Sequence, residues 1–343
     1  YLSRVFQPRL FDLQESTDMG SWDEETIDEM TILSLQNPRW SAKSQKDFLE
    51  TWFQFLRFCA QEDIGVLSHD DLNQNISDPT QGVLRGRRTI ITPFQFDHVL
   101  HALENCHELT DEERNQNIVV LILGFYGGLR SSEVRNLTLA DIVSTGVALF
   151  INIRRSKTEA GRRAIPMHRL LPDTNALSVL RKWAVQRQDE SRNLGSDATL
   201  GTLPLFGPLI KNRRPRWDEV IAPAMAFVHR TLHINIDFHG LRHSAASWLL
   251  LRSYAAYYPD FSAQLQHGSH ACFQAQNQSK LRGLFEVFEP TSADGKEKIL
   301  VHIAKFLGHA NLRSLMLIYG HTIGVIHSHA LSLIHISEPT RPY

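Results

Sequence analysis

The segment that most constrains the fold is "DEERNQNIVVLILGFYGG", residues 111–128. Its first turn is acidic, its middle is apolar on every side, and two glycines end it. Acidic side chains favour a helix N-terminus and glycine favours a helix C-terminus, so the pattern predicts a helix. A helix that is apolar all round has to be covered by other elements. The apolar run falls short of the ~18 residues that span a bilayer, so we expect it at the centre of a globular domain and expect no membrane partner.

Helical spacing of apolar residues and helix-start signals predict the elements that cover this helix. The expected helices are 37–64, capped by Ser41 or Ser44, then 92–106, 129–142, 175–190 and 237–254, with a loop followed by a helix over 204–234. Residues 147–167 differ, because they alternate, are rich in Val, Phe and Ile, and carry Gly161 at a turn. They predict a β-hairpin or the edge of a small sheet. The expected fold class is therefore mostly α with a small antiparallel β-sheet.

At 343 residues the chain favours two domains. Turn-forming residues near residue 80 indicate a linker. We expect an acidic lead-in at 1–36, a helical domain with its linker at 37–88, a second domain at 89–330, and a tail at 331–343. The tail lacks periodicity and looks like a translated sequencing adaptor, so we expect it to be non-native.

The charge is distributed unevenly. The net charge of −1 argues against a nucleic-acid partner, but residues 1–80 carry 6 Lys/Arg against 15 Asp/Glu and the rest carries a net charge of +8. Basic clusters occur at 85–88, 154–163 and 211–216. A single cluster is more often a solvated face, whereas several in one domain favour a polyanionic partner.

No metal site or other cofactor is expected. The three cysteines are odd in number, widely spaced and set among apolar residues, which favours a reducing cytoplasm over a disulfide framework or zinc site: Cys59, Cys106 and Cys272. The late histidines lack helical i,i+4 spacing and accompanying carboxylates: His321, His327 and His329.

Two basic side chains lie at backbone breaks in the middle of the chain. Arg130 follows the glycine pair at the end of the apolar helix, and a cation there needs an anion. Glu133, three residues on, is a simple structural partner for it. Lys157 lies near the tip of the expected hairpin, where a lysine is usually only a solvated charge.

Two further motifs lie near the C-terminus. In "FHGLRHSAAS", His239 and Arg242 are three residues apart and share a helix face. "LGHANLRSLMLIYGH" carries His309 and Tyr319. Taken alone, Tyr319 reads as a core residue with one hydrogen bond. Taken together, the arginines, lysine, histidines and tyrosine predict a site for a tetrahedral anion, because arginine forks bind phosphate oxygens. Tyrosine, with a pKa of ~10, becomes a nucleophile beside cations or a base.

These motifs, in this order, resemble the catalytic domain of tyrosine recombinases, the phage integrase family, over about residues 90–322. Residues 41–85 more weakly resemble the family's helical, SAM-like core-binding domain. The resemblance implies a site-specific recombinase or integrase of a mobile element. Such an enzyme cuts and rejoins DNA through a 3′-phosphotyrosyl intermediate, without metal or ATP.

The resemblance also implies roles for individual residues. Arg130 and Arg242 would clamp the scissile phosphate, and Tyr319 would attack it. Lys157 would protonate the leaving oxygen. His239 would assist proton transfer, and His309 would donate a hydrogen bond to a phosphate oxygen. Glu133 would support Arg130.

The expected partner is double-stranded DNA, bound by a homo-tetramer on two sites with accessory DNA-bending proteins. The protein would be cytoplasmic and associated with the nucleoid when bound to DNA. The basic residues expected to contact the DNA backbone are Arg162, Arg163, Lys211, Arg213, Arg214 and Arg216.

One departure from the family is the separation of 67 residues between Arg242 and His309, where a few tens are common. We interpret the extra length, from about residue 255 to residue 298, as a partly helical surface insertion. Three other functions stay open. They are a recombinase-like protein that binds DNA without cutting it, a type IB topoisomerase-like nicking-closing enzyme, and a metal-dependent hydrolase that a chelator would inhibit.

Overall fold

The computed structural model describes residues 41–61, 89–155, 161–172, 174–193, 200–258 and 269–285, single positions between 261 and 265, and residues 300, 301, 303–308, 325 and 326. The chain divides into two compact units, Tyr1–Arg88 and Thr89–Tyr343. Within the described residues, no helix combines the length and the apolar character that crossing a bilayer requires.

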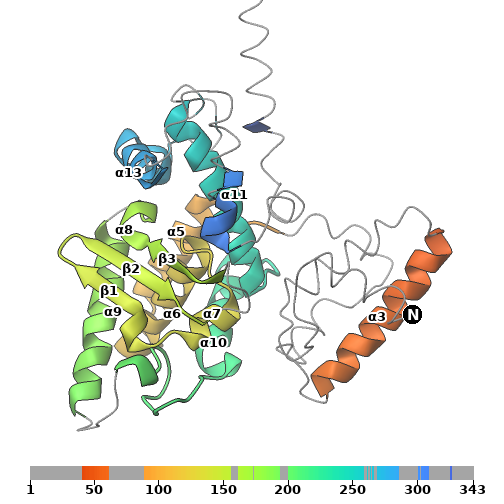
Figure 1. The fold of residues 1–343 in the computed structure, drawn as a ribbon, viewed down its shortest axis with the longest axis horizontal. Coiled ribbons are helices and arrows are strands. Elements are labelled where there is room, and N and C mark those ends of the chain that lie inside the picture. Colours follow the sequence, from red (N-terminus) through yellow and green to blue (C-terminus); the bar gives the residue numbers. More distant parts are fainter. Residues whose placement is uncertain are drawn as a thin grey trace, which may run out of the picture. The chain divides into compact units, whose positions relative to one another are not determined.

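The described part of the first unit is the helix α3 (Ala42–Gln61; Figure 1). Its N-terminus is capped by Ser41, whose Oγ accepts a hydrogen bond from the Ser44 amide at 3.1 Å. Phe48, Trp52 and Leu56 are buried on one face, and the rings of Phe48 and Trp52 stack with centroids 6.3 Å apart. The prediction of a capped amphipathic helix is confirmed.

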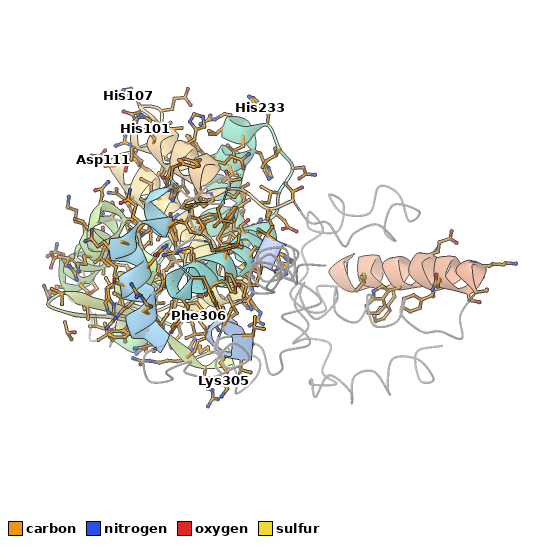
Figure 2. The ribbon with its side chains drawn as sticks, turned by 90° about the horizontal axis from the view of Figure 1, so that it is seen from above. His101, His107, Asp111, His233, Lys305 and Phe306 are labelled. Carbon is orange, nitrogen blue, oxygen red and sulfur yellow. The ribbon has the colours of Figure 1, made fainter. Side chains whose placement is uncertain are left out.

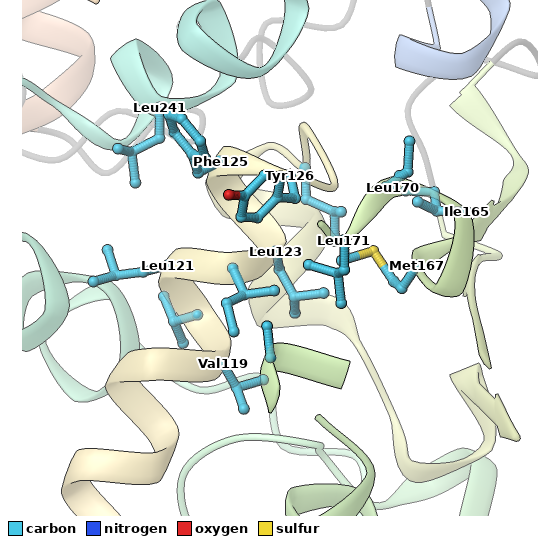
Figure 3. Packing of buried hydrophobic residues seen from close by; sticks show 14 of the residues in the cluster. Val119, Leu121, Leu123, Phe125, Tyr126, Ile165, Met167, Leu170, Leu171 and Leu241 are labelled. Atoms are coloured by element: carbon cyan, nitrogen blue, oxygen red, sulfur yellow. The ribbon is translucent and has the colours of Figure 1, made fainter. Parts of the chain in front are cut away.

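The second unit is built around α6 (Asp111–Phe125), the helix that the sequence placed at the centre. All residues from 117 to 125 are buried. Figure 3 shows Val119, Leu121 and Leu123 reaching from α6 toward its neighbours. The longer helices that contact α6 are α5 (Pro93–Glu104), α9 (Thr174–Asn193), α10 (Trp217–Leu232) and α11 (Phe238–Tyr257). An apolar helix is thus covered from several sides, as its composition requires.

A three-stranded antiparallel sheet lies on this unit, in the order β1 (Ile142–Thr145), β2 (Ala148–Ile153), β3 (Arg163–Pro166). Its strands β2 and β3 confirm the expected hairpin, and α8 (Met167–Leu170) follows β3 directly. The helix expected at 129–142 is wrong in its second half. The observed helix, α7, covers only Ser131–Asn136. A 3-10 turn, η4 (Leu139–Asp141), follows it, and β1 begins at the next residue.

The insertion contributes to the core of the second unit. After a 3-10 turn η7 (Ala271–Phe273) comes the helix α13 (Ala275–Phe285), which packs against α11 and α8. Cys272, Phe273 and Leu281 are buried. Nε2 of His270 lies 2.8 Å from Oδ2 of Asp97 on α5. The helical part was predicted, but the expectation of a surface insertion is wrong for residues 269–285, because their apolar side chains fill the space beside α11.

Candidate active site

The turn after α6 requires glycine. Gly128 has a φ of +61°, in the region where L-residues are strained. A Cβ on Gly128 would lie 2.7 Å from Cδ2 of Leu307. A Cβ on Gly127 would lie 2.6 Å from the carbonyl oxygen of Leu123. The glycine pair therefore lets the chain turn tightly beside Leu307 and places Arg130 at the N-cap of α7.

Glu133 lies between two arginines. Its carboxylate accepts a bond from Nη1 of Arg130 at 3.1 Å and another from the Arg130 backbone amide at 2.9 Å. Arg163, thirty residues later on β3, donates Nη1 to Oε1 at 2.8 Å and Nη2 to Oε2 at 2.9 Å. The expected pairing of Arg130 with Glu133 is present, but the two-pronged bond to Glu133 comes from Arg163.

Burial and charge act against each other at Glu133. Its side chain is 3% exposed. Burial alone would raise the pKa of this carboxyl, but the guanidinium groups of Arg163 and Arg130 outweigh burial, and with a smaller effect of Arg242 they hold the pKa at about 2. Glu133 is therefore a carboxylate at every physiological pH. The same groups act on Arg163. Burial lowers the pKa of its guanidinium, the charge of Glu133 and the hydrogen bonds to it raise that pKa, and the charges of Arg242 and Arg130 lower it further.

Arg242 is fully buried on α11. Its Nη2 donates to the carbonyl oxygen of Leu307 at 2.6 Å, and its Nη1 donates to the carbonyl oxygen of Gly128. A charged donor to a carbonyl is among the stronger hydrogen bonds of proteins. Arg242 thus joins the turn before Arg130 to the segment that precedes His309.

His239 and His243 are buried one turn apart on α11. Their rings meet edge to face with centroids 4.7 Å apart. Asp237 caps the helix, with its Oδ1 accepting from the Gly240 amide at 2.6 Å. The cap lies two residues before His239, and the helix begins at Phe238. No role was predicted for His243, although its i,i+4 spacing from His239 was a signal that the two rings would meet.

Gly308 brings the last motif against the hairpin. Its φ is +78°, and a Cβ there would lie 2.8 Å from Nη1 of Arg163 and 3.2 Å from Cα of Gly161. Nη1 of Arg163 also donates to the carbonyl oxygen of Gly161 at 2.9 Å. The nearby Lys305 and Phe306 are labelled in Figure 2, where they lie at the opposite edge of the unit from His101 and His107.

The structure therefore brings together residues from four separated motifs: Arg130 and Glu133, Gly161 and Arg163, Arg242, and Leu307 and Gly308. Three of the predicted catalytic residues lie outside the described residues: Lys157, His309 and Tyr319. Two of these adjoin the cluster in sequence, since Lys157 belongs to the connection between β2 and β3, and His309 follows Gly308.

Arg163 departs from its predicted role as a DNA contact. Its side chain is 7% exposed and is paired with Glu133. On β3, Arg163 and Ile165 share a face, and Arg163 lies opposite the buried Ile153 of β2. A side chain on this inner face cannot lie along a DNA backbone. Strand alternation was the signal that could have distinguished it from Arg162, which is exposed.

The cluster at 211–216 is partly neutralised by its own chain. Arg213 pairs with Glu219, and Arg216 lies 2.9 Å from Oδ2 of Asp218. The backbone amide of Arg216 also donates to Glu219 at 2.9 Å, at the N-terminus of α10. The remaining basic residues of this cluster are exposed: Lys211 and Arg214.

Within the described residues, no group of three or more His, Cys, Asp or Glu side chains is arranged to hold a metal ion. The late histidines at 321, 327 and 329 lie outside those residues. The chemistry that the described side chains offer is cationic, with guanidinium groups from α7, β3 and α11 around Glu133. Such a cluster suits an anion with several oxygens.

Part of the chain matches a known protein family, and the chain is similar to several solved structures. Residues 90–256 match the model of the Phage integrase family. No curated protein sequence matches the chain. Among solved structures, the XerH site-specific recombinase in a post-cleavage complex with palindromic difH substrate is 16% identical, over 96% of this chain and 77% of that chain, with a TM-score of 0.46. XerA recombinase is 13% identical, over 99% of this chain and 90% of that chain, with a TM-score of 0.43. The Tn1549 transposon integrase in complex with circular intermediate DNA is 15% identical, over 97% of this chain and 94% of that chain, with a TM-score of 0.40.

Proposed function

Since residues 90–256 match the model of the Phage integrase family, we propose that this protein is a DNA strand transferase, a site-specific recombinase or integrase of a mobile element. The observation that carries the proposal is the meeting of Arg130, Glu133 and Arg242 with the segment that ends at Gly308. These residues come from distant parts of the sequence and bring guanidinium groups to one place. A phosphodiester is the DNA group that such a place would bind.

In the proposed reaction, Oη of Tyr319 attacks the scissile phosphorus. A bond forms between that oxygen and phosphorus, and the bond from phosphorus to the 5′ oxygen breaks. Lys157 donates the proton that the leaving 5′ oxygen takes up, and His239 assists proton transfer by accepting the phenol proton that Tyr319 loses. The ester conserves the energy of the broken bond, so ligation is the reverse attack by a 5′-hydroxyl and requires no ATP.

The arginines supply the charge stabilisation that metals provide in other phosphoryl transfers. Of the three arginines around Glu133, Arg130 is the most exposed, at 15%, against 7% for Arg163 and 0% for Arg242. Arg242 acts from the interior, where its bonds to two carbonyl oxygens fix the plane of its guanidinium. In this proposal His309 donates a hydrogen bond to a phosphate oxygen, and no metal takes part.

The proposed partner is double-stranded DNA, held by a homo-tetramer on two sites with DNA-bending accessory proteins. Exposed basic side chains of the second unit would position the DNA backbone rather than read its sequence: Arg162, Lys211 and Arg214. Arg213 and Arg216 would first have to leave their carboxylate partners, so we expect smaller contributions from them.

Covalent capture tests the proposal. The protein is incubated with labelled, nicked duplexes from the DNA that flanks its gene, in EDTA, and run on a denaturing gel. We expect a protease-sensitive shifted band from the parent and no band from Tyr319→Phe. Tyr254→Phe is the matched control, because Tyr254 stacks on Tyr258 on α11 with ring centroids 4.4 Å apart. It should form the band like the parent.

Each other result points to a different function. A band that persists in Tyr319→Phe places the nucleophile elsewhere. DNA binding on a native gel without a band from any variant favours a protein that binds DNA without cutting it. Relaxation of supercoiled plasmid that lacks the site favours a topoisomerase-like enzyme, and loss of activity in EDTA favours a metal-dependent hydrolase.

A further inference from the structure

We propose that Arg163 is a positioning residue of the active site, which holds Glu133 so that Arg130 stays available to the phosphate. This inference rests on the proposed function. It assigns to a buried arginine of the hairpin a role distinct from the surface DNA contact that its position in a basic cluster suggested.

The first support is the geometry at Glu133. Arg163 binds the carboxylate with both Nη atoms, at 2.8 and 2.9 Å, whereas a side-chain bond of 3.1 Å joins Arg130 to it. Paired parallel bonds fix the plane of a carboxylate as well as its position. Arg163 therefore sets the orientation of Glu133, and Arg130 meets a carboxylate already held in place.

The second support is the order of exposure. The side chains of Glu133, Arg163 and Arg130 are 3%, 7% and 15% exposed. The less exposed cation, Arg163, thus makes two bonds to the buried carboxylate, while Arg130 is the more exposed of the two. If Arg163 lost its charge, Glu133 would draw Arg130 inward as its nearest remaining partner, and the carboxylate would compete with the phosphate for that guanidinium.

The third support is the contact with Gly308. Nη1 of Arg163 is so close to Gly308 that a Cβ there would lie 2.8 Å from it, and the same nitrogen donates to Gly161. One guanidinium therefore contacts the end of the hairpin, the carboxylate of α7 and the residue before His309. Its position affects the elements that carry Lys157, Arg130 and His309.

The test compares Arg163→Met, which keeps the length of the side chain and removes its charge, with Arg163→Lys. Arg187→Met is the matched control, because Arg187 is also buried and paired with a carboxylate, Glu190 at 2.6 Å, but lies on α9. Two readouts are followed between pH 5 and pH 8.5. They are the rate of covalent-complex formation and the chemical shift of the ¹³C-labelled Glu133 carboxyl, assigned with Glu133→Gln.

We expect the Arg163→Met rate to fall by about 10²-fold, the effect of misplacing a reacting group by about 1 Å. The groups that face Glu133 are Arg130, Arg163 and Arg242. Without Arg163, burial is opposed only by Arg130 and Arg242, so the pKa of Glu133 should be higher than in the parent. The carboxyl signal and the rate should then respond more strongly to a decrease in pH than in the parent. Arg163→Lys should recover part of both effects, and Arg187→Met should leave the Glu133 titration as in the parent.

A parent-like rate and a parent-like Glu133 signal in Arg163→Met would overturn the inference. Equal slowing by Arg163→Met and Arg187→Met, with no change of pH dependence, would also overturn it, because a purely structural role predicts that result. If the parent forms no covalent complex, the proposed function fails. The Glu133 titration then still shows whether Arg163 holds the carboxylate.

Discussion

Replacing Glu133 by glutamine removes the negative charge that lies between Arg130 and Arg163 while nearly keeping the shape of the side chain. The carboxylate faces the guanidinium groups of Arg130 and Arg163, and glutamine leaves both cations in a buried place. A carboxyl whose pKa falls from 4.5 to about 2 holds its charge in the folded protein with an advantage of about 3 kcal/mol. The range of ~3–5 kcal/mol for breaking a buried ion pair agrees with this magnitude.

We therefore expect Glu133→Gln to lower the free energy of unfolding by about 3 kcal/mol at pH 7. The pKa of Glu133 is depressed in the folded protein, so this stabilisation is fully present above about pH 4.5 and is lost as the pH falls toward 2. The difference between parent and variant should shrink over that interval. Urea unfolding followed by circular dichroism, at several pH values, measures it.

Glu190→Gln is the matched control. Glu190 also pairs with an arginine, Arg187, but its side chain is 33% exposed. Solvent screens such a pair, so we expect a loss below about 1 kcal/mol. An equally small loss in Glu133→Gln, or a loss that stays constant from pH 7 to pH 3, would refute the reasoning that the arginines stabilise a buried carboxylate.

Three other predictions follow from the structure. Gly128→Ala should lower the free energy of unfolding by about 1–2 kcal/mol or more, because φ is +61° and a leucine carbon lies 2.7 Å from the new Cβ; denaturant unfolding checks it. Burial would lower the pKa of His270, but the hydrogen bond to Asp97, the charge of Asp97 and the interactions with Cys272 together outweigh burial and raise it to about 9. Asp97→Asn should therefore move the titration of the His270 ring, followed by NMR, to lower pH. Lys211 is exposed, whereas Arg213 is paired with Glu219. Lys211→Ala should therefore reduce the slope of log affinity for DNA against log salt concentration by about 1, and Arg213→Ala should reduce it by less. Fluorescence anisotropy of labelled DNA over a salt series measures both slopes.

The central helix and the hairpin could be predicted because their signals are local. An acidic first turn and a glycine pair mark the two ends of α6, and its apolar composition requires burial. Alternation marks β2, and Gly161 at a turn precedes β3. The strand β1 was not predicted. Only its first residue, Ile142, is buried and the other three are exposed, so its sequence lacks the alternation of apolar and polar residues that marks a strand.

The inward role of Arg163 could not be read with the same ease, because its partner Glu133 lies thirty residues away. Composition places Arg163 in a run of basic residues. The sheet register, which the sequence does not show, sets it opposite the buried Ile153. The pairing of Arg130 with Glu133 was predictable, since three residues separate them at the start of a helix. The contacts of Arg242 with two backbone carbonyls were not, because any buried carbonyl could have accepted these bonds.

The three arginines differ in what holds them, and the difference orders their proposed roles. Arg242, with no exposed surface, is held by carbonyl oxygens of the turn and of Leu307. Arg163 is held by a carboxylate and is 7% exposed. Arg130 shares that carboxylate at a longer distance and is 15% exposed. A carbonyl leaves the charge of its donor intact, whereas a carboxylate cancels it. In the proposed site, a phosphate would therefore interact directly with the more exposed Arg130 and would also feel the charge of the buried Arg242. The charge of Arg163 is neutralised by Glu133.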